Sequence, residues 1–471
     1  MRQLPHLPIC ILGGNTQMIS RFFRALGKDL REIGLTFAEG SWATRLSFLI
    51  MGFGQLVRGQ LVRGLTMLGL EGGILFYLIS FGWNYLSDIL TLGTVETHKE
   101  GRKTVYGDNS FLILLYGLLT VVIIAALIFL WRVNVRQNRE AELRLKRGKR
   151  LPTNREDLAS LLDKNFDKTL LALPVLGIFV FTVLPIIFMI CIAFTNYDVN
   201  HQPPAKLFTW VGLSNFKELF GIGGEGFGST FFYVLLWTLV WAFFATFLTY
   251  FLGMAVAIMI NKKGIRLKKL WRTILVMTIA VPQFVSLLYV GKMFAADGLV
   301  NGLLLKWGWI QTAIPFWQNA TYARILIILI NLWIGIPYTM LIVTGLLMNI
   351  PAELYESARI DGANAFQTFR KITLPYMLFV TGPFLLTQFI GNLNNFNVIF
   401  LLNQGNPKSM SLAKNAGSTD LLVTWLYKMT INDSNYKIAA VIGIMVFLVT
   451  AVISLVVYNT MPSVKDEEGF Q

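Results

Sequence analysis

Eight segments of this 471-residue sequence are long and apolar enough to cross a lipid bilayer. A transmembrane helix needs about 20 predominantly apolar residues, and six of the eight segments contain no charged residue. The other two carry one each, Glu71 and Lys292. The composition agrees, because 55% of the residues are hydrophobic and only 14% are charged. We therefore expect an all-α integral membrane protein with eight transmembrane helices, at 65–86, 111–131, 170–194, 231–260, 273–296, 325–348, 376–402 and 438–458.

The distribution of basic residues predicts the orientation of the chain. Cytoplasmic loops of membrane proteins carry an excess of Lys and Arg. With both ends placed in the cytoplasm, the inner segments contain 29 Lys and Arg residues and the outer loops only 9. This bias accounts for the net charge of +15 without a nucleic-acid partner. The densest basic run, 139–150, is then a solvated loop that sets the orientation or, alternatively, a site for an anionic partner.

The first 64 residues are expected to stay in the cytoplasm. Pro5 and Pro8 interrupt the only early apolar run and leave it too short for a signal peptide. Residues 18–35, by contrast, predict an amphipathic helix, which lies on an anionic membrane surface or is an ordinary cytoplasmic helix. Residues 1–17 lack this pattern and are expected to be disordered or to precede the true start. The apolar face of the helix would consist of Ile19, Phe22, Phe23, Leu26, Leu30 and Ile33.

Motifs for catalysis and for cofactor binding are absent from the sequence. There is no G-x-x-x-x-G-K-[ST] phosphate loop and no H-E-x-x-H zinc motif. The two cysteines, Cys10 and Cys191, cannot form a disulfide framework or a multi-cysteine zinc site. We therefore expect a transport subunit without cofactor or metal, not an enzyme. For Glu71 we expect snorkelling or an interhelical hydrogen bond, with proton relay as the alternative, and for Lys292 snorkelling.

One predicted cytoplasmic loop, residues 350–375, has an unusual pattern. Pro351 suits the first turn of a helix, and two glutamates place negative charge near its positive end. The pair Asp361-Gly362 then ends this helix, and a second amphipathic stretch leads to Pro375, where the next span begins. Such a helix-turn-helix is suited to fill a groove on another protein. An ordinary cytoplasmic loop is the alternative.

The same segment resembles the EAA signature of the inner-membrane permeases of ABC importers. The matching residues are Glu356-Ser357-Ala358, Gly362, Ile372 and Leu374-Pro375. The one departure is Ser357, which stands where alanine is usual. The resemblance implies a coupling helix that docks into a cleft of an ATPase subunit through Glu356, Ser357, Ala358, Asp361 and Gly362. It also implies a second, MalG-like permease subunit, two copies of the ATPase and an extracellular sugar-binding protein, expected to be a lipoprotein.

The resemblance implies a domain organisation as well. Six spans would form the type I permease core, and the first two would be the amino-terminal addition of maltose-type (MalF-like) permeases. The expected parts are a cytoplasmic segment 1–64, two additional spans and a basic loop 65–168, the core 169–459 and a cytoplasmic tail 460–471. The expected location is the plasma membrane of a bacterium, in contact with membrane lipid.

A weaker sequence resemblance, in three further segments, indicates the class of substrate. Segments 331–340, 392–407 and 418–430 look like those of maltose and maltodextrin permeases. A neutral sugar needs amide and hydroxyl groups beside aromatic faces, without charges. Gln388 departs from the small hydroxyl residue of relatives, and Gly391 from an aromatic one. The sugar-contacting positions of the family fall on Gly335, Tyr338, Gln388, Asn392 and Asn395.

Other interpretations remain open at this point. Asn392, Asn394 and Asn395 could instead form hydrogen bonds between helices. The substrate could be another oligosaccharide, such as a galacto-oligosaccharide. An ion-coupled secondary transporter would more naturally carry buried carboxylates in its spans. In the outer loop 403–436, an apolar stripe predicts a short helix that packs on the membrane face or, alternatively, contacts substrate; it consists of Leu421, Leu422, Trp425, Leu426 and Met429.

Overall fold

The computed structural model describes residues 13–221, 227–262, 264–413 and 415–461. The expectations for residues 1–12 and for the tail beyond 461 lie outside this range, as do the side chains of 13–23, Ala25 and Leu26. The described chain forms two compact units. One comprises Met1–Phe188 with Pro203–Phe208, and the other Met189–Gln202 with Thr209–Gln471.

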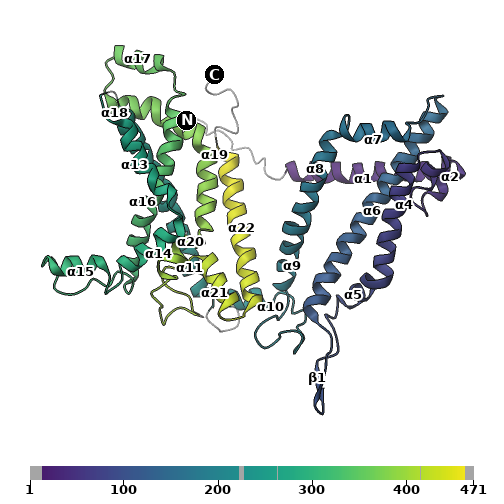
Figure 1. The fold of residues 1–471 in the computed structure, drawn as a ribbon, viewed down its shortest axis with the longest axis horizontal. Coiled ribbons are helices and arrows are strands. Elements are labelled where there is room, and N and C mark those ends of the chain that lie inside the picture. Colours follow the sequence, from purple (N-terminus) through teal and green to yellow (C-terminus); the bar gives the residue numbers. More distant parts are fainter. Residues whose placement is uncertain (1–12, 222–226, 263, 414, 462–471) are drawn as a thin grey trace, which may run out of the picture. The chain divides into compact units, whose positions relative to one another are not determined.

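The first unit is built on three long helical stretches (Figure 1). The first is α4 (Leu61–Tyr77), which continues through a π-helical turn into α5 (Trp83–Asp88), and the second is α6 (Ser110–Lys146). The third is α8 (Phe166–Ile178), which continues into α9 (Leu184–Ile192); α9 belongs to this unit as far as Phe188. The smaller elements are α1 (Gly13–Glu39), α2 (Trp42–Leu46), α3 (Phe53–Val57), α7 (Asn154–Leu162) and a hairpin of β1 (His98–Glu100) and β2 (Lys103–Val105).

Helix α6 is longer than a membrane crossing requires. Its 37 residues give a length of about 55 Å, whereas the hydrocarbon core is only about 30 Å thick. Its carboxy-terminal part carries Asn134 and Asn138, both fully buried. Asn134 accepts a hydrogen bond from Gln55 at 3.0 Å, and Asn138 accepts one from Arg58 at 2.6 Å. These bonds anchor the α2–α3 segment to α6.

Two ionisable residues had been singled out within the predicted spans. The Glu71 carboxylate accepts a hydrogen bond from the backbone N–H of Met51 at 2.7 Å. It therefore has a structural partner in the turn between α2 and α3. Lys292 is exposed in the last turn of α14 (Gln283–Met293).

The second unit contains the remaining helices (Figure 1). They include α10 (Ser214–Leu219), α11 (Phe227–Phe243), α12 (Thr249–Asn261), α13 (Lys268–Ala280), α15 (Leu299–Lys306) and α16 (Ala320–Leu347). They continue with α17 (Ala352–Ile360), α18 (Ala365–Thr368), α19 (Leu374–Leu393), α20 (Phe396–Asn403), α21 (Leu422–Ile431) and α22 (Tyr436–Thr460). Helix α17 lies at one end of this unit and α21 at the opposite end.

Seven helical stretches in the described part are long and apolar enough to cross a membrane. The fifth predicted span, 273–296, differs, because α13 and α14 meet there at an angle of 90°. Pro282 has no backbone N–H and disfavours helical backbone at Val281, which is extended. The prediction of one continuous helix was therefore wrong, and eight crossings result if the bent pair counts as one span.

The predicted helix-turn-helix is largely confirmed. Helix α17 ends at Ile360, and Gly362 follows with a positive φ of 74°. The second stretch does not stop at Pro375, however, because α18 runs through a π-helical turn, Phe369–Thr373, directly into α19. A π-helical turn takes backbone groups out of the regular ladder, which suits a proline that lacks an N–H.

Two buried apolar clusters fill the second unit. The α21-side cluster includes Trp237, Trp241, Leu287, Ile327 and Ile399. The α17-side cluster is made of other residues from the same long stretches, including Tyr250, Met254, Met340, Val343 and Met377. Both clusters draw on α16 and on the stretch α11–α12. Polar residues occupy the interval between them along these helices, and the candidate site lies there.

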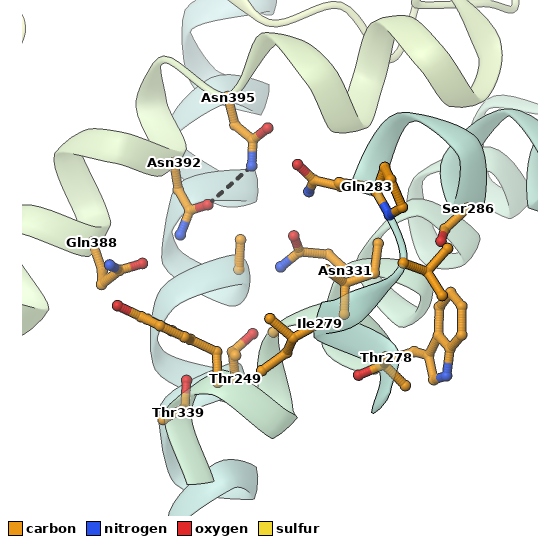
Figure 2. A pocket seen from close by; sticks show the side chains of 17 residues that line it. Thr249, Thr278, Ile279, Gln283, Ser286, Asn331, Thr339, Gln388, Asn392 and Asn395 are labelled. Carbon is orange, nitrogen blue, oxygen red and sulfur yellow. Dashed lines mark hydrogen bonds between the residues drawn. The ribbon is translucent and has the colours of Figure 1, made fainter. Parts of the chain in front are cut away.

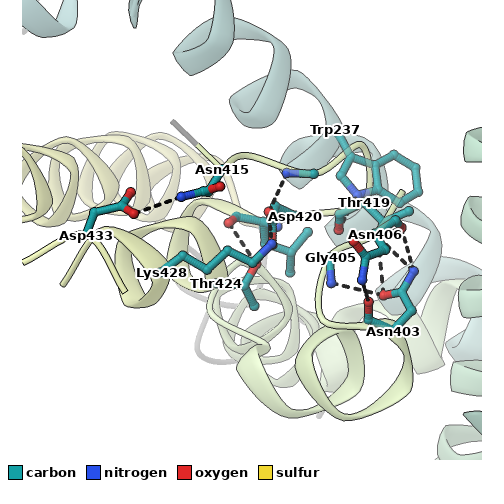
Figure 3. A network of polar contacts seen from close by, with 12 residues as sticks. Trp237, Asn403, Gly405, Asn406, Asn415, Thr419, Asp420, Thr424, Lys428 and Asp433 are labelled. Atoms are coloured by element: carbon teal, nitrogen blue, oxygen red, sulfur yellow. Dashed lines mark hydrogen bonds and ion pairs between the residues drawn. The ribbon is translucent and has the colours of Figure 1, made fainter. Parts of the chain in front are cut away.

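The loop between α20 and α21 is held by a buried polar network (Figure 3). Asp420 is fully buried and forms an ion pair with Lys428 at 2.6 Å. The Asp420 carboxylate also accepts the N–H of Gly417 and the hydroxyl of Thr424. Burial raises the pKa of the Asp420 carboxyl, against the attraction of Lys428. The short helix predicted in the loop 403–436 is confirmed as α21, with Leu421 at its N-cap. Leu421, Leu422, Trp425 and Met429 are buried and Leu426 is half-buried, while packing on the membrane face stays a prediction.

Candidate functional site

A cavity of about 380 Å³ lies among α12, α16, the α13–α14 bend and the α19–α20 segment (Figure 2). None of its described lining residues is charged. Amide and hydroxyl side chains supply most of its polar groups, and Trp333 and Tyr338 supply aromatic surface. The volume falls in the range of about 300–1,000 Å³ that is usual for small-molecule sites. The lining residues are Ala245, Thr249, Thr278, Ile279, Val281, Pro282, Gln283, Ser286, Asn331, Trp333, Ile334, Gly335, Tyr338, Thr339, Gln388, Asn392 and Asn395.

Two helical stripes bring the five predicted sugar-contacting positions together. On α16, Asn331, Gly335 and Tyr338 follow one another at intervals of four and three residues, which places them on one face. On the α19–α20 segment, Gln388, Asn392 and Asn395 repeat this spacing. Both stripes line the cavity. The structure thus places all five residues at one site, and a sugar-binding role for them stays a prediction.

At least one polar group of the cavity has no partner within the described chain. Thr249 is 7% exposed, and its hydroxyl oxygen makes no hydrogen bond. Asn331 is 8% exposed and lines the same cavity. A buried polar group without a partner costs about 1–3 kcal/mol. Such groups are therefore available to a ligand or to water, and the absence of charge suits a neutral, hydroxyl-rich ligand.

The asparagines of the seventh span have different roles. Asn392 donates a hydrogen bond to Thr246 on the neighbouring stretch at 3.0 Å, so the interhelical interpretation is confirmed for this residue. Asn395 donates to Asn392 at 3.3 Å, and it caps the start of α20 by accepting the N–H of Val398. Asn394 is exposed, bonds to its own helix and is not part of the cavity lining. Asn392 thus faces the cavity and also holds two helices together.

The structure adds residues that sequence reasoning missed. Asn331 stands four residues before Gly335, so the helical spacing of that stripe could have revealed it. Thr249 and Gln283 come from other spans, and only the tertiary fold brings them to the cavity. Gly335 also has a packing role, since a Cβ added there would lie 2.7 Å from the Thr249 Cγ2 atom. Helices α16 and α12 therefore approach each other closely at Gly335 and Thr249.

The EAA-like segment lies at the α17 end of the unit (Figure 1). Glu356, Ser357, Asp361 and Gly362 are exposed, and Ala358 is half-buried. Tyr355 fixes the helix to the core, because its hydroxyl forms a 3.0 Å hydrogen bond with that of Thr373. Capping-box hydrogen bonds between Asn364 and Gln367 begin the next helix.

The surface of this segment is unusually apolar for an exposed loop. Ile360 is 87% exposed, Phe366 is 68% exposed and Leu354 is 43% exposed. Exposed large apolar side chains that gather on one element mark surfaces that meet a partner. The described structure thus presents a helix, anchored from behind, with apolar and acidic groups facing outward.

Comparison with known proteins gives consistent results. The family described as binding-protein-dependent transport system inner membrane component matches residues 250–465. The galactooligosaccharides transport system permease protein GanP of Bacillus subtilis is 36% identical over 421 residues, which cover 89% of this chain and 97% of that protein. The maltodextrin transport system permease protein MdxF of the same species is 34% identical over 432 residues, covering 89% and 95%.

A solved structure shares the fold. It is a bacterial ABC transporter involved in the import of the acidic polysaccharide alginate, and one of its chains superimposes with a TM-score of 0.53 at 23% identity. The match covers 64% of this chain and 97% of that one.

Proposed function

Because this chain belongs to the family of binding-protein-dependent inner-membrane transport components, we propose that it is the membrane-spanning permease subunit of an ATP-driven ABC importer for maltodextrin-type oligosaccharides. The substrate class is inferred from the cavity. Amide, hydroxyl and aromatic groups line it, and none of the described lining residues is charged. Such a surface can exchange hydrogen bonds with sugar hydroxyls without desolvating an ion.

The choice among neutral sugars rests on the relatives. One transports galactooligosaccharides and another maltodextrin, at nearly equal identity to this chain. The segments 331–340, 392–407 and 418–430 favour the maltodextrin type. A galacto-oligosaccharide remains the second candidate, and direct comparison of the two sugars in uptake assays distinguishes them.

The proposal includes the assembly of the importer. One EAA-like segment engages one ATPase subunit, so a second, MalG-like permease and two ATPase subunits would complete the complex. An external sugar-binding lipoprotein would deliver the substrate. The bias of basic residues supports cytoplasmic ends in a bacterial plasma membrane. ATP hydrolysis would occur on the ATPase subunits, since the sequence has no phosphate loop.

The cavity can be tested at residues that make no internal hydrogen bond. Replacement of Gln388 or Tyr338 by leucine is expected to lower maltodextrin uptake roughly tenfold, because polar groups of the sugar then lose partners worth about 1–3 kcal/mol each. Uptake is measured in cells that lack the native chain, at matched membrane abundance. Asn394→Leu is the control, since Asn394 caps the end of the helix that carries Gln388 and does not line the cavity. Equal uptake by all three variants would contradict the proposed site.

The coupling role is tested at Gly362. Its positive φ of 74° is strained for a β-branched residue, although no atom lies within 4 Å of an added Cβ. Gly362→Val is therefore expected to disturb the turn after α17 and to reduce sugar uptake and sugar-stimulated ATP hydrolysis together, by about threefold to tenfold. Asparagine adopts this conformation more readily, so Gly362→Asn should retain most activity. Normal coupling in the correctly inserted valine variant would argue against the docking function.

A further inference from the structure

The bend between α13 and α14 forms a third wall of the cavity, to which no role has yet been assigned. The last turn of α13 and the first turn of α14 leave backbone carbonyl and N–H groups without helical partners. Within a membrane, such groups persist only where protein or a water-filled cavity surrounds them. The third wall consists of Thr278, Ile279, Val281, Pro282, Gln283 and Ser286.

Gln283 is the longest polar side chain of this wall. It is the first residue of α14, directly after Pro282. In the described part of the chain its amide has no hydrogen-bond partner, and Figure 2 shows it directed toward the space between Asn331 and Asn395. A primary amide both donates and accepts hydrogen bonds. Gln283 can therefore pair with neighbouring sugar hydroxyls from the side opposite to the α19–α20 stripe.

The charge of the lining decides which sugars can enter. A carboxylate that moves from water into this cavity loses hydration and meets no cation among the described lining residues. The hydroxyls of a neutral sugar instead exchange their hydrogen bonds with water for hydrogen bonds with the cavity lining. The hydroxyl of Thr249, a residue that is 7% exposed, has no hydrogen-bond partner among the described residues, so the cavity holds an unpaired neutral group.

We propose that Gln283 is a specificity-determining residue of the transport cavity. Its amide binds sugar hydroxyls, and its neutrality makes the cavity accept an uncharged oligosaccharide and reject one that carries a carboxylate. This inference rests on the proposed function and adds a contact from the broken span to the two stripes. It also predicts that a positively charged side chain at position 283 changes the class of sugar that binds.

The first experiment measures binding to the complete complex in nanodiscs, without the external binding protein and held with an ATP analogue. The probe is maltotriose. Gln283→Leu is expected to weaken maltotriose binding about tenfold, and Gln283→Asn less, since the shorter amide keeps its chemistry. Gln311→Leu is the control, because Gln311 is an exposed glutamine that does not line the cavity. Unchanged binding by Gln283→Leu would overturn the assignment.

The second experiment tests whether the preference of the cavity can be shifted from a neutral to an acidic sugar. Its probe is a maltotriose derivative in which one C6 hydroxymethyl group is oxidised to a carboxylate. An arginine at position 283 offers a guanidinium that pairs bidentately with a carboxylate. Gln283→Arg is expected to raise the ratio of acidic to neutral sugar binding at least tenfold over wild type, whereas Gln311→Arg should leave it unchanged. A ratio unaffected by Gln283→Arg would refute the charge argument.

The two proposals fail in different ways. If Gln388→Leu weakens maltotriose binding and the Gln283 variants do not, the role of Gln283 is wrong and the cavity remains the site. If the wild-type complex binds no maltotriose although it is intact by size-exclusion chromatography, the proposed substrate is wrong.

Discussion

Replacement of Gly335 by leucine is expected to lower sugar uptake by about a hundredfold, which corresponds to about 2.8 kcal/mol. Gly335 lies in the middle of the α16 stripe, and even a Cβ atom there would come within 2.7 Å of Thr249. A leucine side chain must displace this neighbour or occupy the cavity itself. Overpacking alone costs about 1–3 kcal/mol, and the sugar loses both space and hydrogen-bonding partners. The measurement is maltodextrin uptake at matched membrane abundance.

A matched control is available on the same helix. Gly345 is exposed, and no atom lies within 4 Å of a Cβ added there. Gly345→Leu makes the same chemical change in the same helix and should leave uptake close to wild type. Full uptake by the Gly335→Leu variant would show that the sugar takes a path outside this cavity.

The second large effect concerns stability. Lys428→Met leaves the Asp420 carboxylate buried beside an apolar side chain, 0% exposed and without its ion-pair partner. Removing one member of a buried ion pair costs about 3–5 kcal/mol. We therefore expect a markedly lower thermal unfolding midpoint, measured on the purified chain or complex by differential scanning fluorimetry. The loop between α20 and α21 should loosen first.

A double variant identifies the cause. Asp420→Asn combined with Lys428→Met removes both charges and should recover much of the lost stability, because no uncompensated carboxylate remains. Lys306→Met is the surface control, since Lys306 is exposed and makes no ion pair among the described residues. If the single Lys428→Met variant were as stable as the double variant, the ion pair would have no special importance for the fold.

Hydropathy predicted the membrane helices well but could not detect where they break. Pro174, Pro337 and Pro383 lie inside helices that continue through them. Pro282 instead separates two helices at 90°. In the sequence, all four prolines stand in similar apolar runs. Whether the helix continues or bends at the proline therefore depends on the surrounding tertiary structure. Pro282 lines the polar cavity, and backbone groups freed from a helix are tolerated within a membrane where such a cavity surrounds them.

The candidate site was predictable to the extent that it lies on single helices. The family resemblance implied five residues, and all five line one cavity. Helical spacing explains why those on α16 share a face. The third wall did not follow, because Gln283 becomes a lining residue only through the bend before it. The hydrogen bond from Asn392 to Thr246 joins distant segments and likewise required the tertiary fold.

The two apolar clusters on either side of the cavity have an electrical consequence. The cavity of about 380 Å³ has room for about a dozen water molecules, at about 30 Å³ each. Water inside a bilayer lowers the free-energy cost of placing an ion there, because it hydrates the ion within the low-dielectric layer. Along this chain, an ion leaving the cavity toward either end meets tightly packed side chains such as Trp241 and Ile399, or Met254 and Met340. Moving an ion from water into such an apolar cluster is costly, so we expect the two clusters to oppose the passage of ions along this chain.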